Sequence, residues 1–145
     1  MTQVMGELGE MDRLEQKAED AIANGDAEGA ALTIGKAALM AKILAHQKDN
    51  KESRFLYQTA EILFRGQEYG YRALALFEQA GGQPPASNGV CQYLSQAAKE
   101  IARSQINFQG IKNLDHSLVN RQQRYISQAE EWQLIIRDLQ KDFFC

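Results

Sequence analysis

The stretch KESRFLYQTAEILFRGQEYGYRALALFEQAG, residues 51–81, decides the fold class of this chain. It contains no proline, and its apolar and small residues recur at intervals of four and three along two adjacent lines. This spacing predicts a single helix about 45 Å long with a wide buried face. Gly66, Gly70 and Ala73 form a shallow strip within that face. We therefore expect another helix to cross the long helix at this strip.

Similar patterns on both sides of this stretch predict further helices, separated by clear breaks. Their approximate ranges are 7–23, 27–47, 88–103 and 116–143. Gly25 suits the end of the first helix, and the double proline after Gly82 prevents the long helix from continuing. Residues 104–114 lose helical periodicity, which predicts a long connection. The fold class is therefore predicted to be all-α, as one domain spanning 1–145 and built as a compact bundle of about five helices.

The last of these helices has the most regular pattern. Its members at intervals of four and three are Leu118, Gln122, Tyr125, Ala129, Trp132, Ile136, Leu139 and Phe143. Because only one of them is polar, the pattern favours knobs-into-holes packing against a long partner helix. We expect that partner to be 51–81, with the two long helices antiparallel. The alanine-rich range 27–47 is apolar almost all round and is expected to be the central helix.

Charge and cysteine usage narrow the class of protein. The formal charge is -3, so nucleic-acid binding would require a local basic patch. Cys91 and Cys145 show no paired or metal-binding spacing; we expect Cys91 to pack as a small hydrophobe and Cys145 to be exposed and oxidisable. The most apolar stretch, 29–45, carries two lysines and is too short to span a bilayer. We expect a cytoplasmic protein that has no signal peptide and no membrane contact.

Residue types that carry covalent chemistry are sparse. His116 lies between Asp115 and Ser117, but neighbours in a helix do not converge as a catalytic triad requires. His46 is placed to interact with the carbonyl groups at the end of its own helix. The chain also lacks a Glu-x-x-His pattern and a phosphate-binding glycine loop. We therefore predict that it is not an enzyme, with no catalytic residue, no metal site and no cofactor.

Within residues 56–85, the segment RALALFEQAGGQPP resembles the second helix of a tetratricopeptide repeat. Ala73, Phe77, Ala80 and Pro85 stand where that motif has its small residue, aromatic residue, small residue and proline. The resemblance implies a peptide-binding adaptor. The turn needs one extra residue, however, and no second copy occurs at a period of 34. A plain bundle is therefore the favoured interpretation, and a repeat-like superhelix is the alternative.

The segment ALFEQAGGQPPASNGV also resembles a helix and loop of the HEPN family of helical bundles, some of which are RNases. The nuclease motif of that family is an arginine followed, after four to six residues, by a histidine. Neither His46 nor His116 has an arginine at that distance. The resemblance therefore concerns the fold and does not imply nuclease activity.

Two groups of residues are candidate contact surfaces. Tyr57, Phe64 and Tyr71 recur every seven residues on a third face of the long helix, where they are either exposed for a partner or covered inside the monomer. Phe143 and Phe144 raise the same question, and Trp132 is a further candidate, although its place in the pattern of the last helix favours the core. The candidate basic residues are Lys99, Arg103, Arg121 and Arg124, with Lys112 between the two helices that carry them.

We expect this chain to be a protein-interaction module that acts as an adaptor, regulator or assembly subunit. We also expect it to form a homo-oligomer such as a dimer. The alternative is a helical subunit of an RNA-containing complex, which would bind RNA through the basic patch.

Overall fold

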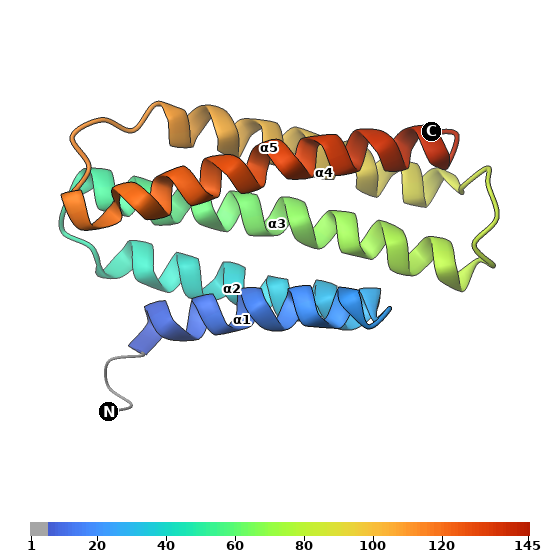
Figure 1. Cartoon of the computed structure of the whole chain (residues 1–145), viewed down its shortest axis with the longest axis horizontal. Coiled ribbons are helices and arrows are strands. Elements are labelled where there is room, and N and C mark those ends of the chain that lie inside the picture. The colour runs from blue at the N-terminus through green and yellow to red at the C-terminus, as the bar shows by residue number, and fades with distance from the viewer. Residues whose placement is uncertain (1–5) are drawn as a thin grey trace.

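The computed structural model describes residues 6–145, and within that range the regular structure is entirely helical. The elements are α1 (Gly6–Ala23), α2 (Ala27–Gln47), α3 (Lys51–Gln79), α4 (Asn88–Gln109), the 3-10 turn η2 (His116–Leu118) and α5 (Val119–Asp142). Consecutive helices run in opposite directions, so α1, α3 and α5 share one direction (Figure 1). The predicted all-α bundle of five helices is confirmed.

The centre of the bundle is α3, a continuous helix that α2 covers on one side and α4 on the other. Asn50 caps its start by accepting a hydrogen bond from the backbone N–H of Ser53 at 2.9 Å. The prediction that α2 is central was wrong, because α2 leaves the side chains of Leu32, Leu39 and Ile43 exposed. Across the described part of the chain, no helix combines the length and the apolar composition needed to cross a membrane.

The small-residue strip on α3 packs against two other helices, whereas the sequence predicted one. A methyl group on Gly66 would lie 2.6 Å from Cγ1 of Ile101 in α4. A methyl group on Gly70 would lie 2.7 Å from Cζ3 of Trp132 in α5. Both distances are shorter than carbon atoms can approach without contact strain. Glycine at these two positions therefore lets α4 and α5 pack closely against α3.

The fourth helix is longer than the sequence pattern predicted. It continues to Gln109, whereas a loss of helical structure was expected from 104. Ser104 is fully buried and donates a hydrogen bond from its hydroxyl group to the carbonyl oxygen of Ile101 at 2.7 Å. Phe108 is also fully buried and stacks on Tyr125 of α5. Tertiary packing of this last turn therefore maintains a helix that its own polar side chains do not favour.

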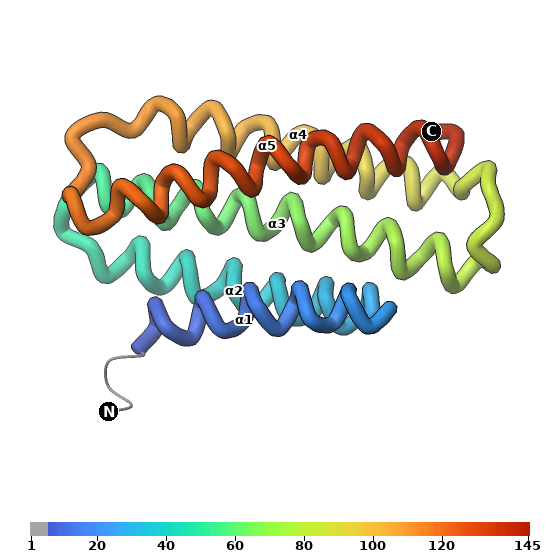
Figure 2. The backbone as a smooth tube through the Cα atoms, viewed as in Figure 1, coloured from blue at the N-terminus to red at the C-terminus, as the bar shows by residue number. Residues whose placement is uncertain are grey.

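The two long helices are parallel, and the predicted antiparallel arrangement was wrong. Pairs of aromatic side chains join α3 to α5, and their numbers rise together: Phe64 with Tyr125, Tyr71 with Trp132, and Phe77 with Phe143. The reason is topological, because α4 lies between α3 and α5 in the chain and each connection reverses the direction (Figure 2). The backbone of α5 packs mainly against α4, and its longest side chains reach α3.

A disulfide bond joins Cys91 to Cys145, so the prediction that the two cysteines are unpaired was wrong, whereas Cys145 is exposed, as predicted. The two residues are 54 positions apart, but their Cα atoms lie 5.5 Å from each other. The antiparallel packing of α4 and α5 brings the first turn of α4 beside the end of α5. The backbone N–H of Ala86 also donates to the carbonyl oxygen of Phe143 at 2.9 Å. The end of α5 is therefore fastened to the start of α4.

Candidate functional site

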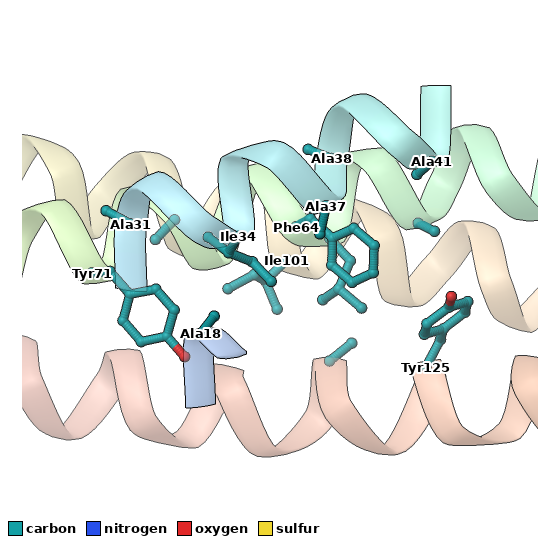
Figure 3. Close-up of a cluster of buried hydrophobic side chains, with 14 of the residues drawn as sticks. Ala18, Ala31, Ile34, Ala37, Ala38, Ala41, Phe64, Tyr71, Ile101 and Tyr125 are labelled. Atoms are coloured by element: carbon teal, nitrogen blue, oxygen red, sulfur yellow. The ribbon is translucent and has the colours of Figure 1, made fainter. Parts of the chain in front are cut away.

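The aromatic residues predicted as a contact surface belong to the core. Tyr57 and Phe64 are fully buried, and Tyr71 is almost so. Phe64 packs its ring edge-on to that of Tyr125, and Figure 3 shows both rings inside the bundle. The face of α3 that carries Tyr57, Phe64 and Tyr71 is covered because α5 lies along it. Phe144 is 70% exposed, and its role as a contact residue stays a prediction.

The predicted basic patch is largely neutralised by carboxylates. Arg121 donates to both oxygens of Asp12 on α1, at 2.7 and 2.9 Å. Arg124 lies 3.6 Å from Asp12, and Arg103 lies 3.5 Å from Glu100 on its own helix. The side chain of Lys99 is exposed on α4. Arg121 and Arg124 therefore hold α1 against α5, and they do not form an open cationic surface.

This contact closes one end of a groove that the helices leave between α1 and α5. The groove has a volume of about 380 Å³. It is lined by Glu15, Glu19, Ile22, Ile34, Gln67, Tyr71, Leu74, Gln128, Glu131, Trp132 and Ile135. The groove exists because α1 packs mainly on α2 and α5 mainly on α4, with α3 visible between them in Figure 2. We call this feature the α1–α5 groove.

Its most unusual group is the carboxylate of Glu15, whose residue is only 9% exposed. Burial raises the pKa of Glu15 to about 7, against the opposing charge of Arg124, whose Nη2 lies 3.7 Å from Oε1. Nε2 of Gln128 donates to Oε2 of Glu15 at 3.3 Å. Oε1 of Glu15 and Oε1 of Gln128 are both buried and accept no hydrogen bond from the described residues. The groove therefore contains two buried acceptor atoms, one from each of its helices, that lack a donor.

Aromatic rings form one wall of the groove. Tyr71 and Trp132 pack edge to face with their centroids 5.0 Å apart. Trp132 can take this position because Gly70 beneath it has no side chain. Burial raises the pKa of Tyr71 to about 12, and the negative charge of Glu19 adds to that increase. The Tyr71 hydroxyl group therefore stays protonated near neutral pH.

Negative charge is concentrated along the exposed rim. Glu19 on α1 and Glu131 on α5 are both exposed and both line the groove. Acidic, aromatic and apolar surface are thus combined in one depression, which is the arrangement that suits a cationic group with an apolar stem. The described residues include no group of three His, Cys, Asp or Glu side chains arranged to hold a metal ion.

Sequence reasoning missed this site, although part of its signal is visible. Glu15 and Glu19 are four positions apart on α1, so they share a face of that helix. Gln128 and Trp132 have the same spacing on α5. In the sequence, both pairs fit the ordinary surface or core pattern of a helix. No feature of the sequence near either pair indicates that α1 and α5 are neighbours. Of the residues that line the groove, Tyr71 and Trp132 were singled out beforehand as candidate contact residues.

Neither protein-family models, nor curated proteins, nor solved structures provide a match for this chain. The resemblances to tetratricopeptide repeats and to HEPN bundles therefore stay hypotheses carried by the residues that suggested them.

Proposed function

We propose that this chain is a non-enzymatic protein-interaction module, and that the α1–α5 groove binds a short basic segment of another protein. One observation carries the proposal: the groove brings the carboxylates of Glu15, Glu19 and Glu131 beside the rings of Tyr71 and Trp132. Charge complementarity of this kind selects partners and speeds their association. A basic side chain with a long methylene stem matches both the acidic and the apolar parts of the surface.

The size of the groove supports a short segment as its occupant. Its volume of about 380 Å³ is near the lower limit for small-ligand pockets, which span roughly 300 to 1,000 Å³. It has room for one or two side chains and is too small to enclose a helix. The partner therefore inserts a side chain, and the flanking residues of its segment lie along the rim at Glu19 and Glu131.

Binding without catalysis also agrees with the groups in the groove. Glu15, with its pKa of about 7, is a candidate for proton transfer. General acid–base catalysis requires a second group that attacks or orients the reacting atom. The residues that α5 contributes to the groove are Gln128, Glu131, Trp132 and Ile135, and the described lining contains no serine, threonine, cysteine, histidine or lysine that could serve as a nucleophile.

The test uses Trp132, which is the single tryptophan of the chain and lines the groove. A titration with a lysine–glycine peptide should change its fluorescence to saturation, whereas a glutamate–glycine peptide of equal length should not. Binding should weaken as salt rises, because exposed charges contribute to it. Absence of a saturable change with the lysine peptide would contradict the proposal.

Neighbouring residues provide matched control variants. Glu131→Lys places a positive charge on the rim and should reduce the affinity by about tenfold or more. Glu130→Lys makes the same change in net charge on the adjacent residue, which does not line the groove, and should have a much smaller effect. Glu19→Lys and Asp20→Lys form the same kind of pair on α1. If both members of each pair weakened binding equally, the site would not be the groove.

Two expectations about context stay predictions. A homodimer is tested by mass measurement in solution. The cytoplasmic location is tested by thiol alkylation in intact cells, and the Cys91–Cys145 disulfide bears against it, because such bonds persist mainly in oxidising compartments.

A further inference from the structure

Helix α2 has an outer face on which large apolar side chains stay exposed. The helix packs mainly against α1 and α3, and residues of its inner face such as Ala37 and Ala41 are fully buried (Figure 3). On the outer face, Leu32, Leu39 and Ile43 are 55%, 51% and 42% exposed. None of these three residues lines the α1–α5 groove. The outer face of α2 is therefore an apolar surface separate from the site proposed for a basic segment.

The exposed residues of this face have the spacing of a coiled-coil seam. Leu32, Lys36, Leu39 and Ile43 follow one another at intervals of four, three and four, and all four are exposed. Side chains at these intervals form one stripe along a helix, which a second helix can bury. Lys36 can lay its methylene stem on apolar neighbours and keep its ammonium group in water. We call this stripe the α2 seam.

We infer that the α2 seam binds the α2 seam of a second copy of this chain, with the two helices antiparallel. In this arrangement Leu32 of each copy faces Ile43 of the other, and two-fold symmetry forms every contact twice. The inference gives the expected homodimer a defined interface. It uses a different surface from the α1–α5 groove, so it does not depend on the proposed function.

The charges beside the seam favour a second copy and set its direction. Glu28 lies in the first turn of α2 and Lys42 lies near its end, and both are exposed. They are 14 positions apart, or about four turns, so they lie on the same side of the seam. An antiparallel pair brings the acidic end of each helix to the basic end of the other, whereas a parallel pair brings like charges together. Because flanking charges of this kind set the orientation of paired helices, two copies complement each other at both ends.

The length of the seam predicts a weak dimer. Its apolar residues span 32–43, which is about 17 Å of helix at the standard rise. A face of this length covers less than the roughly 800 Å² per partner of a standard interface. We therefore expect a mainly monomeric chain at about 1 µM and a mainly dimeric chain at about 1 mM.

The experiment measures the mass of the full chain by sedimentation equilibrium across this range of concentration. The mass should rise from the 16.3 kDa of one chain toward twice that value. Leu32→Gln and Ile43→Gln should each raise the dissociation constant about tenfold or more, because symmetry removes two apolar contacts at once. Leu134→Gln is the matched control, since Leu134 is 57% exposed on α5, and it should leave the constant unchanged. Circular dichroism identifies any variant that fails to fold.

Charge reversal tests the direction of the two helices. Glu28→Lys and Lys42→Glu should each weaken the dimer severalfold, because each substitution brings like charges together at both ends. A chain that carries both substitutions should recover most of the affinity. Glu130→Lys makes the same change in net charge on an exposed residue of α5 and should have a much smaller effect. In a parallel pair, the two single variants would dimerise as the unaltered chain does.

The outcomes separate this inference from the proposed function. A monomer at every concentration would overturn the inference, and so would a dimer that persists unchanged in both Leu32→Gln and Ile43→Gln. Single charge variants without effect, or a double variant without recovery, would overturn the antiparallel arrangement. Failure of the lysine–glycine peptide to bind would contradict the proposed function and would leave the α2 interface standing.

Discussion

Two carboxylates of α1, Asp12 and Glu15, both lie against the arginines of α5 and yet behave oppositely. Asp12 accepts two short hydrogen bonds from Arg121, and Glu15 accepts one longer bond from the amide of Gln128. Burial alone would raise the pKa of Asp12, but the contacts with Arg121 outweigh it and hold the pKa below its usual value. At Glu15 burial dominates, and the pKa rises to about 7.

This difference separates a contact in which donors and acceptors are matched from one in which they are not. At the Asp12 end, donors and acceptors of the two helices match, so the contact fastens α1 to α5. At the Glu15 end, beside the groove, the helices bury two acceptor oxygens that lack a hydrogen-bond donor. A polar group that is buried without its hydrogen-bond partner is costly, so the Glu15 end of the contact between α1 and α5 contributes less stability than the Asp12 end. The predictions below test whether this division of roles is real.

The largest effect is expected where the end of α5 is anchored. Reduction of the Cys91–Cys145 bond opens a loop of 54 residues, which corresponds to about 4 kcal/mol of stability in the chain-entropy model. Urea unfolding with and without a reductant measures the loss. The variant with both cysteines changed to serine should match the reduced chain and be insensitive to the reductant. A response of that variant to the reductant would show that the effect does not come from the bond.

A smaller loss is expected at the Asp12 end. Arg121→Met removes both donors from Asp12 and a 3.2 Å hydrogen bond to the Tyr125 hydroxyl group. The expected decrease in the free energy of unfolding is about 2 kcal/mol, less than for a fully buried pair because Asp12 is partly exposed. Gln128→Leu at the Glu15 end should change stability by under about 1 kcal/mol, because removal of an unpaired acceptor partly offsets the loss of the 3.3 Å hydrogen bond to Glu15. Equal decreases in the free energy of unfolding for the two variants would contradict the proposed difference between the Asp12 end and the Glu15 end.

The pH dependence of stability tests Glu15 directly. Its pKa is raised from an ordinary 4.5 to about 7, so the folded chain binds the proton more tightly than the unfolded chain. The contribution of Glu15 protonation to the free energy of unfolding is fully present below pH 4.5 and is lost as pH rises through 7. The expected decrease is about 2 kcal/mol between pH 5 and pH 7.5. The contribution of Asp12 has the opposite sign and is already complete in this range, since its pKa is lowered. Glu15→Gln should flatten the slope in urea unfolding, and an unchanged slope would mean that another group titrates.

Most of the fold was predictable because the signals that specify it are local. Four-and-three spacing marked the helices, and Ser87 and Asp115 cap the elements that follow them. Gly66 and Gly70 marked the crossing point on α3, since a strip without side chains is useful only where another helix approaches. The last turn of α4 was missed because its helical structure depends on the burial of Phe108.

The candidate site was not predictable in the same way, because its parts are far apart in the sequence. Glu15 and Gln128 meet only because the bundle brings α1 and α5, from opposite ends of the sequence, next to each other. The heptad of α5 is compatible with a parallel or an antiparallel partner, so the pattern did not specify the direction. The burial of Tyr57 and Phe64 follows from the same packing and removed them from the surface.

By itself the sequence determined a helical chain, the ends of most of its helices and the position where they cross, because propensity, capping and small-residue spacing act over a few residues. Only the tertiary structure decided which helices are neighbours, that Cys91 and Cys145 are bonded and that two acceptors are buried without donors. The physical reason is that burial and pairing depend on residues brought together from opposite ends of the chain.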